Sequence, residues 1–226
     1  MSDQVKTRTK SEETRDRILR SALDMFHDRG FESTTMREIA VRAEVATGAA
    51  YYYFNSKDAI VLAFYDRARR DMEPQMEEAL GESRELRERL RRIIKVKLDY
   101  FAPSRKLLGA HSGHTNPEYP LSPFSEETRE IREEDIRFFE RALEGSRTPG
   151  PKDLKSYLPI LLWMYQMGII LFWINDSSPR QAKTDVLLEK SLDLVTRLIK
   201  LAGLPLTGPI RKTVIQLMDA LMANRT

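Results

Sequence analysis

A segment with almost no side chains leads directly into four consecutive aromatic residues. Ala46 to Ala50 are all small, and Tyr51 to Phe54 follow without a break. Small residues let a helix approach a groove closely, while phenol hydroxyls can donate to phosphate oxygens and the rings can contact thymine methyl groups. These residue types, in this order, are suited to binding in the major groove of a duplex.

The helical period divides the segment between two faces. At 100° per residue, one face about 140° wide holds Thr47, Gly48, Tyr51 and Tyr52. The opposite face holds Ala49, Ala50, Tyr53 and Phe54. One face can anchor the helix on a core while the other meets something outside. Alternatively, all three tyrosines are core residues with their hydroxyls at the rim, which is common for Tyr. The spacing by itself leaves both interpretations open.

Histidine offers another candidate chemistry. His111 and His114 have the spacing of a metal-binding pair, and Glu118 is nearby. Gly113 argues against a helix there, and no further ligand is evident, so we expect no metal site. The chain has no Cys, its three His have no evident triad partners, and no Gly-rich phosphate loop occurs. We therefore expect no enzyme activity and no cofactor.

Composition gives only weak guidance about partners. The 226 residues are 41% apolar and 31% charged, and the formal net charge is +3. Residues 1–58 contain ten Lys or Arg and ten Asp or Glu, so bulk charge is no argument for nucleic acid. Any basic footprint must be local, for example at Arg37, Arg42 and Lys57. The N-terminus has no apolar stretch of a secretory signal, and we expect a cytoplasmic, nucleoid-associated protein.

The elements that position these residues are helices. Apolar residues at helical spacing predict a helix over about residues 11–29. Thr35 and Glu38 form a capping box that opens a short second helix. The small and aromatic run forms a third short helix, and a fourth extends from about Asp58 to about Ala79.

The rest of the chain continues this pattern, so the expected fold class is all-α. We expect helices over about residues 83–101, 125–143, 157–174, 179–202 and 209–222, with an irregular stretch over about residues 103–125. Ser178, Pro179 and Gln181 supply the N-cap, N1 and N3 signals of a helix start. No segment has a convincing β pattern.

Two short helices joined by a few residues describe a helix-turn-helix. The sequence here reads T-x-x-x-I-A-x-x-A-x-V, then a Gly, then Y-x-Y-F-x-x-K and an aliphatic residue. The matching residues are Thr35, Ile39, Ala40, Ala43, Val45, Gly48, Tyr51, Tyr53, Phe54, Lys57 and Ile60. This pattern, over about residues 11–60, resembles the DNA-binding domain of the TetR/AcrR family of bacterial transcriptional regulators.

The resemblance implies which residues touch double-stranded DNA. By that resemblance, the DNA-binding residues are Thr35, Arg37, Thr47, Gly48, Ala49, Tyr51, Tyr52, Tyr53 and Lys57. The chain departs from the family in the turn, where Glu44-Val45-Ala46 stands in place of the common Gly-Val-Ser. Loss of the Ser removes an N-cap worth about 1 kcal/mol, unless Thr47 takes over that role. Glu44 places an acid near the phosphates.

The resemblance also implies the domain organisation. Residues 1–58 would form the DNA-binding domain, with residues 1–10 as a flexible basic tail. Residues 59–226 would form a larger helical domain that binds a small-molecule effector and dimerises. The expected function is a homodimeric repressor that leaves a palindromic operator when an apolar or aromatic effector binds. The alternative is a small-molecule-binding or protein-interaction module that has lost DNA binding.

The run from Tyr157 to Ile174 carries no formal charge and has three interpretations. It is long enough for a membrane span, but Pro159, Gln166 and Gly168 interrupt it, and we expect no membrane. A fully buried core helix is the second interpretation. The third is a helix shared between a ligand pocket and a dimer interface.

The next helix favours the third interpretation, because its two adjacent apolar stripes exceed what one monomer face needs. The dimer-interface candidates are Leu187, Ser191, Leu194, Leu198 and Leu201. Aromatic and Met side chains suit an adaptable apolar pocket. The pocket candidates are Tyr100, Phe101, His111, His114, Tyr119, Phe139, Trp163 and Met167.

Overall fold

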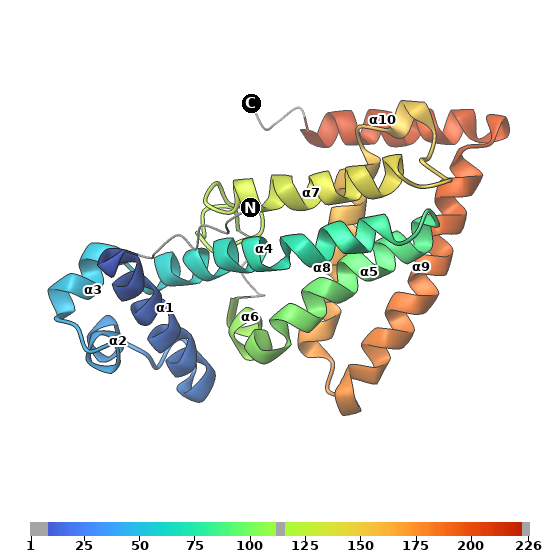
Figure 1. Cartoon of the computed structure of the whole chain (residues 1–226). Helices are drawn as coiled ribbons and strands as arrows, with labels where there is room; N and C mark the ends of the chain where they lie inside the picture. The colour runs from blue at the N-terminus through green and yellow to red at the C-terminus, as the bar shows by residue number, and fades with distance from the viewer. Residues whose placement is uncertain (1–8, 112–115, 223–226) are drawn as a thin grey trace, which may run out of the picture. The chain divides into compact units, whose positions relative to one another are not determined.

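The protein is helical throughout the part that the structure describes. A computed structural model describes residues 9–111 and 116–222, and these ranges contain no strand, which confirms the predicted all-α fold. The predicted basic tail lies mostly outside these ranges. The α-helices (Figure 1) are α1 (Lys10–Arg29), α2 (Met36–Arg42), α3 (Thr47–Tyr53), α4 (Lys57–Gly81), α5 (Leu86–Phe101), α6 (Arg105–His111), α7 (Arg129–Glu144), α8 (Leu158–Asn175), α9 (Ala182–Ala202) and α10 (Gly208–Met222).

The chain forms two compact units. Unit 1 comprises Met1–Arg69 and Pro103–Arg129, and unit 2 comprises Arg70–Ala102 and Glu130–Thr226. Residues 103–129 therefore group with the N-terminal helices, although we expected them in the helical effector domain. The domain boundary at residue 58 stays a prediction.

Local capping explains where the first helices of unit 1 begin. Thr9 opens α1 and Thr35 opens α2, each through a capping box with the Glu three residues later, so the capping box predicted at Thr35 is confirmed. Helices as short as α2 and α3 are not stable alone and depend on packing. The fully buried side chains that hold them are Ile18, Leu19, Phe26, Ile39, Ala50 and Ile60.

A helix in residues 105–111 contradicts the predicted irregular stretch. There α6 packs against α1 and buries Leu107 and His111. The edge of the His111 ring lies on Phe31, with 4.4 Å between ring centroids, and its Nδ1 is 2.9 Å from the Tyr119 hydroxyl. The prediction rested on the four prolines of this stretch, Pro103, Pro117, Pro120 and Pro123, and the helix itself contains Gly109. Burial against α1 overrides the roughly 1 kcal/mol that a helical Gly costs.

Unit 2 is a bundle in which α9 packs against both α5 and α8. Arg89 joins helix ends in this bundle, because its guanidinium donates to the carbonyls of Leu80, Ser83 (2.8 Å) and Arg141 (2.9 Å). These carbonyls lie at or just beyond helix C-termini, and that of Arg141 also accepts from the Gly145 amide (3.0 Å). The largest fully buried side chains of the bundle are Leu90, Ile93, Ile94, Phe139, Gln166, Leu188 and Leu192.

The uncharged segment forms α8. By length and composition alone this helix could cross a membrane, a test that the core helix of a bundle also passes. In the structure α8 packs against α9, and its buried residues are Leu158, Pro159, Leu162, Trp163, Gln166, Ile169 and Trp173. This burial supports a core role for one face of the helix.

The start of α9 differs from the predicted capping pattern. Residues Pro179–Gln181 form a 3-10 turn in which Arg180 and Gln181 have positive φ, and α9 begins at Ala182. The predicted cap between Ser178 and Gln181 does not form. Instead Asp176 accepts hydrogen bonds from the Thr184 amide (2.8 Å) and hydroxyl (2.7 Å). The Ser178 hydroxyl accepts from the Lys183 amide (3.1 Å), so a buried carboxylate and this hydroxyl together cap the first turn.

Candidate nucleic-acid interface

The turn between α2 and α3 contains a strained residue. Glu44 has a φ of 55°, in the left-handed region that favours glycine. The Val45 amide donates to the Ala40 carbonyl (3.0 Å), which closes the turn. The sequence departs from the resembled family at this position, and the backbone has kept the conformation that glycine would adopt most easily.

No side chain caps α3. Ala46 is the N-cap, with φ −64° and ψ 146°, and it makes no side-chain hydrogen bond. Thr47 is the first helical residue, so it does not take over the capping role. The first turn of α3 thus relies on packing.

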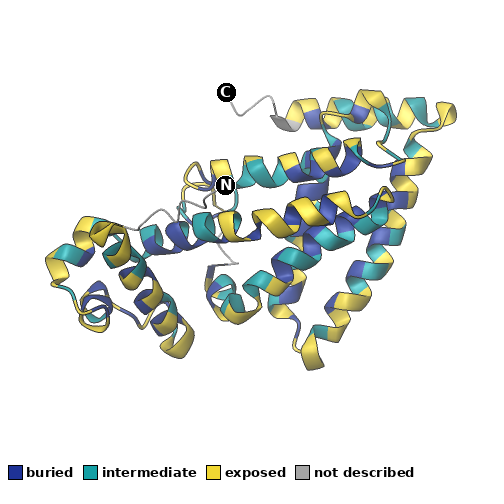
Figure 2. Ribbon diagram, viewed as in Figure 1, coloured by how far each residue is buried: buried dark blue, intermediate teal, exposed yellow. Residues whose placement is uncertain are grey.

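The two faces of α3 separate as the helical period predicted. Ala50 and the adjoining Phe54 are buried, whereas Tyr51 is 51% and Tyr52 is 82% exposed. Thr47 and Gly48 are also exposed, and a Cβ on Gly48 would meet nothing within 4 Å. Figure 2 shows the exposed colour over much of this N-terminal helical region. The exposed edge therefore has open space in front of its small residues. The interpretation that all three tyrosines are core residues is wrong for Tyr51 and Tyr52.

Tyr53 and Lys57 are held within unit 1. The Tyr53 hydroxyl forms a 3.2 Å hydrogen bond with the Ser11 hydroxyl, and the ring lies edge-on to Tyr52. Lys57 donates to the Phe31 carbonyl (2.7 Å), and its ammonium lies 4.3 Å from the centroid of the Phe31 ring. Each retains polar capacity, but both side chains fix α3 and α4 to their neighbours. Ser11 carried no signal for this contact in the sequence.

The start of α2 combines a cap with an ion pair. The Thr35 hydroxyl donates to Glu38 (2.6 Å), and Arg29 pairs with the same carboxylate (2.9 Å). The Thr35 hydroxyl, then the Thr35 amide and Arg29, hold the pKa of Glu38 below its ordinary value. Arg37 is exposed one residue before Glu38, and no ion pair of the described residues engages it. Its guanidinium is an accessible cation on α2, the helix that packs against α3.

Family comparisons identify the unit that carries this edge. The description "Bacterial regulatory proteins, tetR family" matches residues 18–64. The description "Tetracyclin repressor-like, C-terminal domain" matches residues 89–216, more than half of the chain. The chain belongs to the TetR family. The resemblance noted in the sequence is thereby confirmed, and the chain is a member of a family of transcriptional regulators.

Individual relatives agree over shorter lengths. The HTH-type transcriptional repressor KstR2 of Mycolicibacterium smegmatis is 45% identical over 47 residues, which are 21% of this chain and 23% of KstR2. The HTH-type transcriptional activator FasR of the same organism is 33% identical over 89 residues, 39% of this chain and 41% of FasR. These matches span less than half of either relative. Among solved structures, a TetR transcription regulator from Haloarcula marismortui is similar with a TM-score of 0.63 at 14% sequence identity. The match covers 83% of this chain and 98% of that one, and it shows that the two share a fold.

In this TetR-family chain the predicted pocket residues do not all lie in one unit. Phe139 and Trp163 are buried in unit 2, and Met167 of the same unit is half-buried. Tyr100 and Phe101 also belong to unit 2, and the Tyr100 hydroxyl donates a hydrogen bond to Asp71 (2.8 Å). His111 and Tyr119 lie in unit 1, and His114 lies outside the described residues. Two grooves of about 320 Å³ and 350 Å³ occur on unit 2, and none of the predicted pocket residues lines either. The pocket stays a prediction.

The predicted dimer stripe lies along one side of α9. Leu194, Leu198 and Leu201 are exposed, while Leu187 and Ser191 are half-buried, and Ser191 bonds to the Tyr165 hydroxyl (2.7 Å). In the adjacent apolar stripe of α9, Leu188, Leu192 and Ile199 are buried. On α8, three further apolar side chains are exposed, namely Met164, Leu171 and Phe172.

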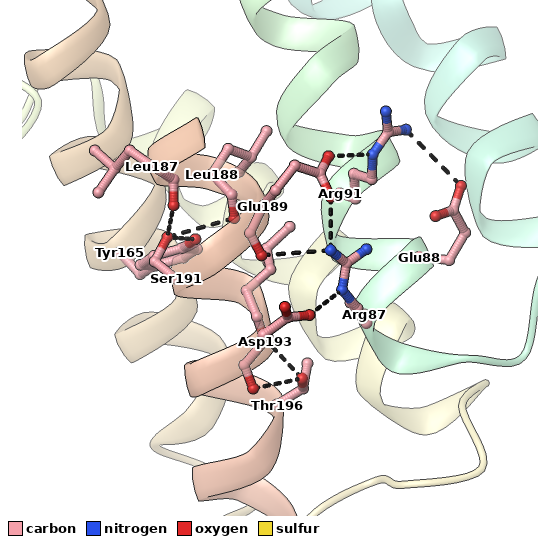
Figure 3. A network of polar contacts seen from close by, with 11 residues as sticks. Arg87, Glu88, Arg91, Tyr165, Leu187, Leu188, Glu189, Ser191, Asp193 and Thr196 are labelled. Carbon is pink, nitrogen blue, oxygen red and sulfur yellow. Dashed lines mark hydrogen bonds and ion pairs between the residues drawn. The ribbon is translucent and has the colours of Figure 1, made fainter. Parts of the chain in front are cut away.

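The charged side of α9 is occupied by α5. Figure 3 shows Arg87 donating to Asp193 (2.5 Å) and Glu189 (2.6 Å), and Arg91 donating to Glu189 (2.6 Å). The hydrogen bond from Arg87 lowers the pKa of Asp193. These ion pairs fix the rotation of α9 about its axis, so its exposed leucines are held away from α5.

Proposed function

We propose that this TetR-family protein is a homodimeric DNA-binding repressor whose operator affinity falls when an apolar or aromatic effector binds. The exposed edge of α3 carries this proposal. A helix anchored by Ala50 and Phe54 presents Thr47 and Gly48 at its front and two exposed tyrosines behind them. Such an edge has little structural use within unit 1, because its side chains point to solvent.

The DNA contacts follow from this geometry. The small front residues allow α3 to enter the major groove, where Thr47 and the rings of Tyr51 and Tyr52 reach base edges and thymine methyls. Arg37 contacts a phosphate or a base edge. Thr35, Tyr53 and Lys57 bind the backbone with the hydrogen-bonding capacity that their internal contacts leave, and Ala49 lines the groove.

Dimerisation uses the exposed stripe of α9 together with α8. Two helices from each subunit would form a four-helix interface across a two-fold axis. A seven-residue recognition helix reads few base pairs, so a second copy about 34 Å away is needed to read a palindromic operator. The exposed leucines Leu194, Leu198 and Leu201 supply the apolar surface for this interface.

Release by an effector follows from the separation of the two functions along the chain. Unit 1 carries the groove-reading edge, and α4 runs from unit 1 into unit 2. An effector that favours another arrangement of unit 2 changes the separation of the two α3 helices through α4, and binding to successive grooves is lost. KstR2 is named a transcriptional repressor, which agrees with repression, whereas FasR is named an activator, so activation is the other outcome. Such a protein works on DNA in the cytoplasm.

A gel shift with the DNA upstream of the protein's own gene tests the proposal at two salt concentrations. We expect binding that weakens with salt and is abolished by Arg37→Ala or Tyr52→Ala, with helicity unchanged. Leu206→Ala, at a side chain of η4 (Pro205–Thr207) that is 91% exposed, serves as the matched control and should bind as the wild type does. Failure of the wild type to bind under any salt or effector condition would favour the module without DNA binding.

A further inference from the structure

Gln166 is a buried polar residue without a hydrogen-bond partner. It lies in the middle of α8 and is 0% exposed. Neither its amide nitrogen nor its amide oxygen has a partner among the described residues. Burying an amide in this way is costly, because it gives up its hydrogen bonds to water and gains none. Such a group in a native fold calls for a physical explanation.

The other buried polar side chains of unit 2 have hydrogen-bond partners, although the Nε of Arg89 makes none. Each of them makes at least one hydrogen bond, and they are Arg89, Lys97, Ser146, Asp176, Thr184 and Thr196. The bundle thus pairs its buried polar groups as a rule. Gln166 stands apart because both of its amide ends lack partners, which leaves a donor and an acceptor side by side for a molecule that enters the core.

The surroundings of Gln166 limit what that molecule can be. Three buried residues share the face of α8 that carries Gln166. They are Trp163, three residues before it, Ile169, three residues after it, and Trp173, seven residues after it. No residue of α8 carries a formal charge. A molecule here meets apolar and aromatic surface around one amide, and α8 offers nothing to balance a charge.

We propose that Gln166 is the polar anchor of the effector site, and that the effector carries a neutral donor and acceptor side by side on an apolar body. A lactam, an imide, a primary amide or a protonated carboxylic acid has this head group, since each can accept from the Gln166 nitrogen and donate to its oxygen. A carboxylate can only accept, so it would leave the Gln166 oxygen unpaired and would place a charge beside a helix that carries none. This inference rests on the proposed function, in which unit 2 binds an effector.

Binding at Gln166 requires the core of unit 2 to rearrange. Gln166 lines neither of the two grooves described on this unit, so neighbouring side chains must move to admit a ligand. The core contains adaptable side chains for this, among them Met72 and Met76 of α4. A ligand that binds only the rearranged core shifts the population towards that state. The buried position therefore couples occupancy to a change of conformation.

The test uses two probes of matched size and shape on the full-length protein. The saturated bicyclic lactam octahydroquinolinone can both donate and accept a hydrogen bond, whereas the ketone decalone can only accept one. The chain has two Trp, both on the Gln166 face of α8, so quenching or enhancement of Trp emission reports binding there. We expect the wild type to bind the lactam about tenfold more tightly than the ketone. Gln166→Met, which conserves volume, should bind the two probes within about twofold of each other. Gln216→Met, the same change at an exposed residue of α10, should keep the wild-type preference.

Three results would overturn the proposal: equal binding of both probes by the wild type, no lactam binding up to its solubility limit, or a lactam preference that survives in Gln166→Met. The melting temperature of the unliganded Gln166→Met protein is a second measurement. It should equal or exceed that of the wild type, because an unpaired amide is removed, and a clear decrease would mean that the amide has a structural partner.

This experiment is independent of DNA. If Gln166→Met loses the preference for the lactam and the wild type does not shift operator DNA, the role of Gln166 as the polar anchor is supported and the proposed repressor function is overturned. If the wild type shifts operator DNA in a way that depends on Arg37 but does not bind the lactam, only the role proposed for Gln166 is overturned.

Discussion

The uncapped start of α3 predicts that Ala46→Ser stabilises the recognition helix. Ala46 already has the extended backbone of an N-cap, with φ −64° and ψ 146°, and its side chain is exposed, so a hydroxyl fits without displacing a neighbour. The added oxygen accepts from an amide of the first turn, most naturally that of Ala49 at N3. The expected gain is about 1 kcal/mol, with a range of roughly 0.5–2 kcal/mol.

Amide hydrogen exchange in α3 measures this gain directly. The Ala50 amide donates to the Ala46 carbonyl (3.1 Å) and the Phe54 amide to the Ala50 carbonyl (2.9 Å), so both report opening of the helix. A gain of about 1 kcal/mol slows their exchange about fivefold. Exchange in α8, at the Trp173 amide for example, is the internal reference and should not change.

A companion variant separates capping from charge. Ala46→Asp caps as well as Ser does, but it adds a negative charge beside the exposed edge of α3. Both variants should slow exchange, whereas only Ala46→Asp should weaken operator binding under the proposed function. Unchanged exchange in both variants would refute the reasoning, since it would mean that the first-turn amides are already satisfied.

Further predictions concern single positions. Glu44→Gly relieves the left-handed strain and should raise the free energy of unfolding by up to about 1 kcal/mol in urea titrations, where Glu44→Ala should not. Gly145→Ala brings a methyl group against the Arg89 guanidinium and should destabilise unit 2 by about 1–3 kcal/mol, read from the loss of Trp emission in urea. Leu198→Lys should leave the thermal midpoint nearly unchanged and shift sedimentation from dimer to monomer, and an unchanged dimer would exclude this stripe. Burial acts to raise the pKa of Asp176, but hydrogen bonds outweigh it and hold that pKa below its ordinary value. Its stabilising effect is therefore complete above about pH 4 and is lost as the pH falls towards the lowered pKa, so Asp176→Asn should flatten the acid limb of a pH–stability curve.

Features that depend on neighbours along the chain were predictable from the sequence. The capping box of Thr35 and Glu38 involves residues three apart, and the helical period places Tyr51 and Tyr52 on one face, although it does not say which face is exposed. The absence of a side-chain cap at Ala46 follows from the residue type alone, because a methyl group cannot accept a hydrogen bond. Local geometry decides each of these, and no distant contact competes with it.

Features decided by distant contacts were not predictable. The helix α6 forms because Leu107 is buried against α1, many residues earlier in the chain, and its local Gly109 argues the other way. At the start of α9 the signal from Ser178 and Gln181 was strong, yet Gln181 takes no part in the cap, and buried Asp176 adds two bonds to the one that the Ser178 hydroxyl accepts. Local propensity was outweighed in both cases by burial of a nearby group.

Gln166 illustrates a third limit. In the sequence it was one of three interruptions in an uncharged run, which counted only against a membrane span. An uncharged helix has no polar face to show which side is buried, so only the fold places the amide inside and shows that its partners are missing. A polar residue in an apolar helix is thus ambiguous until its burial is known.

The exposed edge of α3 also limits how the proposed repressor can read DNA. Gly48 and Ala49 have no hydrogen-bonding side chain, so direct readout falls to Thr47, Arg37 and the tyrosine rings, which favour thymine methyl groups. With no net charge in residues 1–58, few phosphate contacts are available to one subunit. Affinity must then come from two subunits acting together. A variant that is monomeric through Leu198→Lys should therefore lose operator binding even though its α3 edge is intact.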